Sequence, residues 1–352
     1  MRTIIKQVVG IDVAQKELVV CLGRMYNDWR PELYAYKSFV NTSKGFDALT
    51  KWVGQLVDNT VPVLYAMEAT GVYHESLAYY LHEAKQEISI ILPNKISNYA
   101  RTLTVKTITD KTASEAIALF GLERHLEQWT KPKDIYKQLQ QLTREREQLI
   151  AERTVLKNQL HAELAQAIPY KKSVDRIQKR IDLLDKQEKE IQQEIEVLIK
   201  TDKEVQQNVL LLCSIPGVGI LTAATVLAET NGFELIRNKR QLTSYAGLDV
   251  REKQSGTSVR GKARISKKGN RYLRKAMYMP SLAAIRYNNG FKAIFARIVA
   301  RHGIKKKAGV AIQRKLLELM YTLYKKQETF NKHYILPKEE CMEEAEILGG
   351  EH

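Results

Sequence analysis

Between residues 135 and 205 the chain contains no glycine, and its apolar side chains recur in a heptad pattern. In the second half of this segment the repeat alternates spacings of four and three over Ile177, Ile181, Leu184, Glu188, Ile191, Ile195 and Leu198, with one polar intrusion at Glu188. In the first half Leu142, Leu149 and Leu156 keep a spacing of seven. Such repeats form the contact seam of paired helices. Because Pro169 separates the halves, the segment predicts a long antiparallel coiled-coil hairpin.

This hairpin has two alternative uses in a chain of 352 residues. It is either a spacer within one molecule or a surface that pairs with a second copy. We expect pairing, because a long exposed seam buries its apolar side chains when it dimerises.

The first 125 residues instead alternate strand and helix patterns. The expected strands cover residues 7–13, 18–22, 33–40, 61–67 and 88–92, and the expected helices cover about 43–57, 73–84, 93–103 and 111–123. The first three strands follow one another closely, which predicts an antiparallel meander. The order βββαβαβαα is that of an RNase H-like sheet, in which βαβ units follow the meander.

The expected organisation therefore has four parts. They are an α/β RNase H-like domain at 1–128, the helical hairpin at 129–205, a mostly α-helical domain at 206–330 and a polar tail at 331–352. A length of 352 residues agrees with two or three domains.

The charge and composition narrow the class of partner. The formal net charge is +16 and the pI is about 9.5, which favours nucleic acid over a membrane surface, with a merely basic protein as the alternative. Cys21, Cys213 and Cys341 are far apart and lack metal-ligand spacing, so we expect a reducing cytoplasm. No apolar run approaches the roughly 20 residues of a membrane span, and the N-terminus lacks the pattern of a signal peptide.

Three carboxylates occupy matching places at the ends of expected elements. Asp12 ends the first strand, Glu68 ends the fourth, and Asp110 opens the helix after Thr109. The two strands are neighbours in an RNase H-like sheet, so the acids should meet at one edge. They would repel one another unless a cation neutralised them, and Mg²⁺ prefers such oxygen ligands and shares its coordination sphere with phosphate. For Asp110 alone, a plain helix N-cap is the alternative.

Two further segments suit phosphate binding. The glycines of Pro216-Gly217-Val218-Gly219 resemble the hairpin of a helix-hairpin-helix element, which would let the backbone approach a phosphate, although an ordinary turn is the alternative.

Residues 237–275 hold thirteen Lys or Arg and only two acids. Nine cations surround Ser255: Arg251, Lys253, Arg260, Lys262, Arg264, Lys267, Lys268, Arg271 and Arg274. They are typical either of a solvated basic face or of a loop that grips nucleic acid.

A serine in such a loop can attack a phosphodiester. The arginines would stabilise the developing negative charge, whereas the base must come from elsewhere because the loop contains no His. Composition alone does not distinguish Ser255 from Ser258.

In combination these motifs resemble the DEDD-type transposases of bacterial insertion sequences, which are bridge-RNA-guided recombinases. The N-terminal matches are Gly-Ile-Asp-Val at 10–13, Met-Glu-Ala-Thr-Gly-Val-Tyr at 67–73 and Thr-Asp-Lys at 109–111, and they match a RuvC-like domain. The C-terminal matches are Ile-Pro-Gly-Val-Gly at 215–219, Leu-Thr-Ser-Tyr-Ala-Gly-Leu at 242–248, Gln-Ser-Gly at 254–256 and Lys-Gly-Asn-Arg-Tyr-Leu-Arg at 268–274. The resemblance covers nearly the whole chain.

The resemblance implies a mechanism and a set of partners. It implies that Ser255 forms a covalent phosphoserine link to DNA while Asp12, Glu68 and Asp110 hold Mg²⁺ beside the same phosphate. It also implies a structured non-coding guide RNA that pairs with target and donor DNA. The family acts as homodimers that assemble into a homotetramer, in a bacterial cytoplasm at the nucleoid.

One position departs from the family pattern. The family has a fourth acid three residues after the third, and this chain has Ala113 there. Three explanations are open: an engineered, inactivated variant, a natural degenerate protein, or replacement by Glu115 from the next turn. The alternative functions are a RuvC-like Holliday-junction nuclease, with Ser255 only a phosphate contact, and a non-catalytic nucleic-acid-binding protein.

Overall fold

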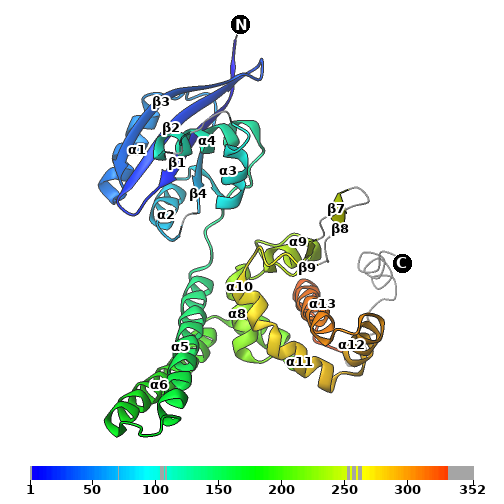
Figure 1. The fold of residues 1–352 in the computed structure, drawn as a ribbon. Coiled ribbons are helices and arrows are strands. Elements are labelled where there is room, and N and C mark those ends of the chain that lie inside the picture. The colour runs from blue at the N-terminus through cyan, green and yellow to red at the C-terminus, as the bar shows by residue number, and fades with distance from the viewer. Residues whose placement is uncertain are drawn as a thin grey trace. The chain divides into compact units, whose positions relative to one another are not determined.

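The computed structural model shows two compact units, residues 1–131 and 132–352 (Figure 1). It describes residues 2–69, 71–103, 107, 109–251, 254–255, 259–260 and 264–331, with the backbone only at 254–255 and 259–260. Lys253, Lys262 and nearly all of the expected polar tail lie outside the described residues. No helix in the described part of the chain is both long and apolar enough to cross a membrane.

The first unit contains a five-stranded sheet in the order β3-β2-β1-β4-β5. Its strands are β1 (Ile4–Val13), β2 (Glu17–Tyr26), β3 (Pro31–Val40), β4 (Val63–Glu68) and β5 (Glu87–Ile91). The first three strands pair antiparallel, and β1, β4 and β5 pair parallel. The helices are α1 (Ser43–Gly54), α2 (Glu75–Glu83), α3 (Pro93–Ala100) and α4 (Asp110–Glu123). The predicted order of strands and helices is confirmed, and it is the RNase H-like order.

Alternation along the strands distributes the apolar side chains over both faces of this sheet. On β1, Val9 and Ile11 belong to one core, which α1 and α2 complete with residues such as Leu49 and Leu77. Val8 belongs to a second core on the opposite face, which α3 and α4 cover (Figure 1). The central strands of the sheet are therefore buried on both faces, whereas β3 is exposed along much of its length.

The second unit is mostly helical. Its helices are α5 (Asp134–Leu164), α6 (Lys171–Thr201), α7 (Lys203–Cys213), α8 (Ile220–Thr230), α9 (Lys239–Ala246), α10 (Arg271–Ala276), α11 (Tyr278–Tyr287), α12 (Asn289–His302) and α13 (Lys305–Lys326). Four two-residue strands lie between α9 and α10: β6 (Val250–Arg251), β7 (Gln254–Ser255), β8 (Val259–Arg260) and β9 (Arg264–Ile265).

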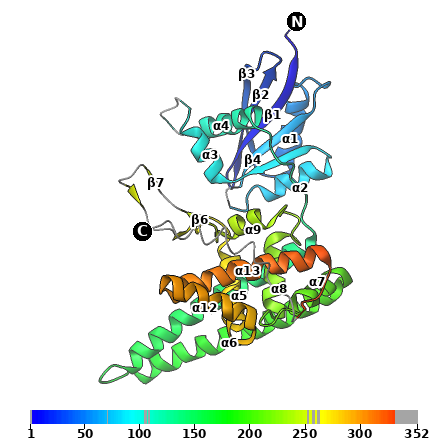
Figure 2. The same cartoon turned by 90° about the vertical axis from the view of Figure 1, so that its right-hand side faces the viewer.

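Helices α5 and α6 form an antiparallel hairpin (Figures 1 and 2). Six of the seven predicted heptad positions of α6 are buried, among them Ile177, Ile181 and Ile195. At the end of the repeat Ile199 is buried instead of Leu198, which is half-buried. The polar intrusion in the seam is also explained: Glu188 accepts a hydrogen bond from Arg146 at 2.7 Å and another from Arg153, both on α5. The α6 seam is thus satisfied within one molecule, and supercoiling and pairing with a second copy stay predictions.

The hairpin shares its core with the helices that follow it. Tyr136 and Leu139 of α5 and Ile195 of α6 belong to one buried cluster with residues of α7 to α13, such as Leu227 and Met320. The expected separation of 129–205 from 206–330 is therefore corrected. The heptad pattern reveals that α5 and α6 pair, but it does not reveal which third layer covers the base of the pair.

Candidate functional site: an acidic sheet edge and a basic ribbon

Asp12 and Glu68 lie on the same face of the sheet at the same edge. Alternate residues of a strand point to the same face of the sheet. Asp12 therefore lies on the same face as Val8 of β1, and Glu68 on the same face as Ala66 of β4, which is the face that α4 covers. The parallel register pairs Ile11 with Met67, and the next residues along the two strands are Asp12 and Glu68.

Two glycines let α4 approach this face closely. A Cβ on Gly10 would lie 2.4 Å from the Ala118 nitrogen and 2.4 Å from the Ser114 oxygen, and one on Gly121 would lie 2.7 Å from a methyl group of Val8. These contacts show that α4 runs opposite to β1, with its N-terminus at the end of the strand that carries Asp12. This direction brings Asp110, the first residue of α4, to the acidic edge.

The helix start has its own cap, so Asp110 is not needed for that role. The Thr109 hydroxyl accepts a hydrogen bond from the Thr112 N–H at 3.2 Å, and the Thr112 hydroxyl accepts one from the Thr109 N–H at 2.8 Å. This reciprocal arrangement is a capping box. The alternative reading of Asp110 as the N-cap is therefore wrong.

The three acids influence one another electrostatically. Burial, then the Asp110 carboxylate and then that of Glu68 raise the pKa of Asp12 from 3.8 to about 6, while a hydrogen bond from the Val13 backbone opposes them. Asp12 is half-buried, so part of this repulsion is screened by solvent. A bound cation would remove the repulsion and favour the ionised form.

The carboxylates at this edge have the chemistry that a hard divalent cation prefers, but they do not lie close enough together to form a metal site. Carboxylate oxygens are the ligands that Mg²⁺ prefers. Within the described ranges, however, no group of three His, Cys, Asp or Glu side chains lies close enough to hold a metal ion. The structure thus shows acids that interact at one edge, with Asp12, Glu68 and Asp110 as the available ligands.

Position 113 lies on the stripe of α4 that faces the sheet. Asp110, Ala113, Ser114 and Ile117 follow helical spacing, and Ser114 and Ile117 are fully buried there. Glu115 lies elsewhere, because its carboxylate is 4.0 Å from Lys111 Nζ. Burial, and to a smaller extent the Glu115 carboxylate, raise the pKa of the Cys21 thiol to about 12. Cys21 belongs to β2, so Glu115 faces β2 rather than the end of β1.

Ser255 lies on a narrow β-ribbon. At the base of the ribbon, Val250 pairs with Ile265 and Arg251 with Arg264; farther out, Ser255 pairs with Val259. The ribbon lies between α9 and α10 in the sequence, and the described strands are antiparallel. Where the structure describes it, the sequence-predicted loop therefore consists of two short antiparallel strand pairs, and Ser255 belongs to the pair of β7 and β8.

The predicted cations differ in what they contact. Arg251, Arg264, Lys267, Lys268 and Arg271 are exposed, as a nucleic-acid surface requires. Arg274 is half-buried and donates hydrogen bonds to the carbonyls of Ala246, at 2.7 Å, and Gly269, at 3.1 Å. Arg274 therefore has a structural role in holding the chain around α9, whatever else it contacts.

The glycines between α7 and α8 have separate roles. Gly217 has a φ of +90°, and a Cβ there would lie 2.6 Å from the Ala283 Cβ, so this glycine is required by packing on α11. Gly219 has open space around its missing Cβ and precedes α8, which has no side-chain cap. Of the two, Gly219 is the position suited to a phosphate.

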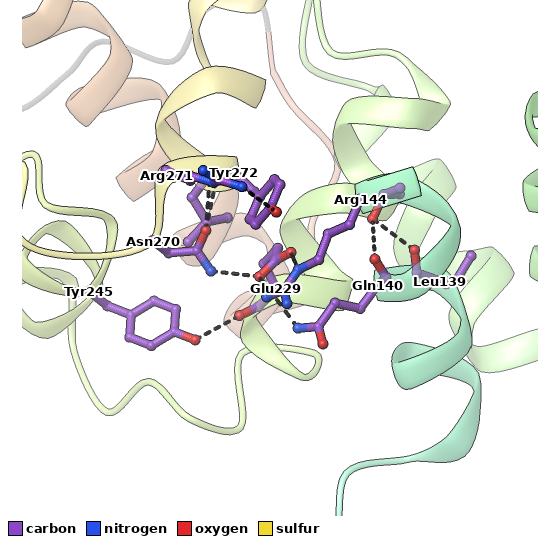
Figure 3. A network of polar contacts seen from close by, with 10 residues as sticks. Leu139, Gln140, Arg144, Glu229, Tyr245, Asn270, Arg271 and Tyr272 are labelled. Atoms are coloured by element: carbon purple, nitrogen blue, oxygen red, sulfur yellow. Dashed lines mark hydrogen bonds and ion pairs between the residues drawn. The ribbon is translucent and has the colours of Figure 1, made fainter. Parts of the chain in front are cut away.

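A buried polar network that the sequence analysis missed joins α5 and α8 to the start of α10 (Figure 3). Glu229 of α8 is held by Arg144 of α5 and by Asn270, which precedes α10. Tyr245 donates a hydrogen bond to the Glu229 carbonyl at 3.0 Å, and Tyr272 lies under the Arg144 guanidinium, 4.7 Å from the ring centre. The available signal is a single charged residue in the otherwise uncharged run Leu221–Thr230.

Comparisons with known proteins agree with the motif pattern. A family model of DEDD IS110 type, described as a transposase, matches residues 9–169, and one described as the transposase IS116/IS110/IS902 family matches 209–296. The pilin gene-inverting protein of Moraxella bovis is 29% identical over 93% of this chain and 98% of its own. The transposase for insertion sequence element IS1111A of Coxiella burnetii is 32% identical over 33% of each chain. Among solved structures, T. thermophilus RuvC in complex with Holliday junction substrate has 10% identity and a TM-score of 0.27, over 35% of this chain and 99% of its own.

Proposed function

The chain belongs to the DEDD-type IS110 transposase family, and we propose that it cuts and rejoins DNA through a phosphoserine link guided by a non-coding RNA. The observation that carries the proposal is the acidic edge, where Asp12, Glu68 and Asp110 come from β1, β4 and α4. Acids so placed have the chemistry of a phosphoryl-transfer site.

In the proposed step, Ser255 supplies the nucleophile. Its Oγ–P bond forms as the P–O bond to one deoxyribose oxygen breaks, and the serine proton passes to a base at the acidic edge. The released oxygen leaves as a hydroxyl after it takes a proton from water or the same edge. A hydroxyl of the exchanged strand later attacks the phosphoserine, which reforms a phosphodiester and restores the serine.

The protein's side chains have distinct parts in this step. Asp12, Glu68 and Asp110 would hold Mg²⁺, which supplies charge stabilisation at the scissile phosphate. Arg251, Arg264 and the other ribbon cations bind the backbone on either side. We propose that serine and acids of one site come from different protomers of a tetramer, with the guide RNA supplying the sequence specificity in the bacterial cytoplasm.

A covalent adduct tests the nucleophile. In a chain that carries Ala113→Asp, we expect Mg²⁺-dependent strand exchange to rise at least tenfold and a protein–DNA adduct to appear on denaturing gels. Adding Ser255→Ala should abolish the adduct, and adding Ser258→Ala should retain it. Metal-dependent cleavage that survives Ser255→Ala without an adduct would indicate a junction nuclease instead. No gain from Ala113→Asp would reject the idea of inactivation.

The co-purifying nucleic acid tests the guide. We expect one discrete, RNase-sensitive species when the protein is purified at moderate salt, digested with RNase and DNase separately, and the remainder sequenced. Heterogeneous DNA would instead support a nucleic-acid-binding protein or nuclease without a guide.

A further inference from the structure

Glu229 is the most completely buried carboxylate in the described part of the chain, with a side chain that is 0% exposed. Arg144 binds it with two parallel hydrogen bonds, from Nε to Oε1 at 2.7 Å and from Nη2 to Oε2 at 2.8 Å (Figure 3). Burial of a charge is costly unless the charge is paired and hydrogen-bonded. A buried ion pair in a helical core therefore indicates that Glu229 has a role other than filling space in the core.

The same carboxylate ties α8 to the start of α10. Asn270 Nδ2 donates to Glu229 Oε2 at 2.6 Å, while Asn270 Oδ1 accepts from the N–H groups of Tyr272, at 2.9 Å, and Leu273, at 3.1 Å. Asn270 is therefore both the N-cap of α10 and a ligand of Glu229. The carboxylate fixes the side chain that begins the helix.

From Asn270 a series of backbone contacts continues to the ribbon. The Asn270 N–H donates to the Tyr245 carbonyl at 2.7 Å, that of Lys267 to the Gly247 carbonyl at 3.1 Å, and that of Ser266 to the Asp249 carbonyl at 2.8 Å. The next pair outward is Val250 with Ile265, which begins the ribbon. The segment that follows α9 and the segment that precedes α10 are thus joined up to the base of the ribbon.

The approach of these two segments is tight. A Cβ on Gly269 would lie 2.4 Å from the backbone carbonyl oxygen of Tyr245 and 2.7 Å from the backbone nitrogen of Gly247. The ribbon itself has only two residues in each strand at its base, and isolated two-stranded ribbons are marginally stable in water. Its orientation therefore depends on how its base is held.

We propose that Glu229 is a positioning residue, which orients the Ser255 ribbon through Asn270. This inference rests on the proposed function of Ser255 and deepens it. Glu229 touches no nucleic acid; it holds α5, α8 and the start of α10 in one geometry, from which the ribbon extends. Loss of the link would leave the nucleic-acid surface charged but misdirect the serine.

The test compares two buried glutamates in the same unit. Glu229→Gln removes the carboxylate that Arg144 and Asn270 hold, and Glu188→Gln removes the one that Arg146 and Arg153 hold in the hairpin. Glu229→Gln leaves Arg144 without a carboxylate, and Glu188→Gln does the same to Arg146 while Arg153 keeps Asp185, so both variants should lower Tm. Only Glu229→Gln should raise hydrogen exchange at the Lys267 and Asn270 amides at least tenfold.

The same pair is then compared in full chains that also carry Ala113→Asp. At saturating DNA, Glu229→Gln should slow adduct formation at least tenfold with a Kd within threefold of the parent, and Glu188→Gln should leave the rate within twofold. An equal loss of rate in both variants would assign the effect to stability and overturn the proposal.

Asn270→Asp breaks the link by placing a second carboxylate beside Glu229, and covers the case in which Glu229→Gln does not fold. Aspartate keeps an oxygen to cap α10 but presents an acceptor to Glu229 in place of a donor. It should reproduce both the faster amide exchange and the slower adduct formation. Combining Glu229→Gln with Asn270→Asp exchanges donor and acceptor, and should recover at least half of both losses.

Unchanged amide exchange in Asn270→Asp would overturn the proposal, as would the absence of rescue in the double variant. If the parent chain forms no Ser255 adduct, the proposed nucleophile is wrong, and the exchange measurements still decide whether Glu229 holds the ribbon.

Discussion

At the scale of single residues, Asp12 shows the conflict between stability and function at the acidic edge. Burial and the neighbouring acids Asp110 and Glu68 raise its pKa from 3.8 to about 6, so the folded state binds the proton more tightly than the unfolded state does. The stability that this proton contributes is fully present below about pH 4 and is lost as the pH rises through about 6. At neutral pH the metal-free edge therefore destabilises the first unit.

Asp12→Asn should relieve this repulsion, because asparagine cannot ionise. Without metal we expect the variant to be more stable than the parent at pH 8 by about 1–2 kcal/mol, after allowance for solvent screening, and close to it at pH 4. Urea unfolding at both pH values in EDTA measures the difference. Mg²⁺ or Mn²⁺ should stabilise only the parent. Glu83→Gln, on the exposed side of α2, should show neither effect, and an equal gain at both pH values would contradict the argument.

At the scale of elements, the site depends on how closely α4 packs on β1. The helix and strand patterns of the sequence predict both elements, but the distance between them is determined by Gly10 and Gly121, where neighbouring atoms occupy the place of a side chain. Close packing brings the N-terminus of α4, with Asp110, to the end of β1.

Gly10→Ala should separate the two elements. Its methyl group would meet the backbone of α4 at 2.4 Å, and backbone cannot yield as a flexible side chain can. We expect the free energy of unfolding to fall by about 3 kcal/mol and divalent-metal stabilisation to weaken. Gly54→Ala is the matched control: nothing lies within 4 Å of its Cβ at the end of α1, so the change should be neutral or slightly stabilising. Equal effects of the two substitutions in denaturant titrations would refute this role of Gly10.

At the scale of the whole molecule, charge is divided unequally between the two units. Residues 1–131 contain 15 Lys or Arg and 14 Asp or Glu, a net charge of +1, so residues 132–352 carry +15 of the total +16. Between Glu252 and Glu318 there are 18 Lys or Arg and no acid. The first unit thus holds the acidic edge, and the second holds the polyanion-binding charge.

Separately expressed units should divide the activities accordingly. Each has its own buried cores, so we expect both fragments to fold. Fragment 132–352 should retain nucleic-acid binding that weakens steeply with salt, with a log–log slope of roughly −4 or steeper. Fragment 1–131 should bind DNA at least 100-fold more weakly. Fluorescence anisotropy at several salt concentrations measures both, and comparable affinities would contradict this division.

Much of the fold was predictable, because it depends on local periodicity. Strand alternation and the order of elements identify the five-stranded sheet, and the heptad spacing around Ile181 and Ile195 identifies the hairpin. The ends of β1 and β4 also identify Asp12 and Glu68 as neighbours, since adjacent parallel strands end at the same edge. Each of these inferences uses residues close in the sequence or a topology with few alternatives.

The sequence by itself determined the elements of the first unit, the helical hairpin, the acidic edge and the basic segment around Ser255. Only the tertiary structure decided that the hairpin shares a core with the C-terminal helices, that Glu115 faces β2, and that Glu229 contacts Arg144 and Asn270. The physical reason is distance along the chain: Arg144, Glu229 and Asn270 are separated by 41 residues or more, and no local pattern reports their contact. Burial of a paired charge is a property of the assembled core.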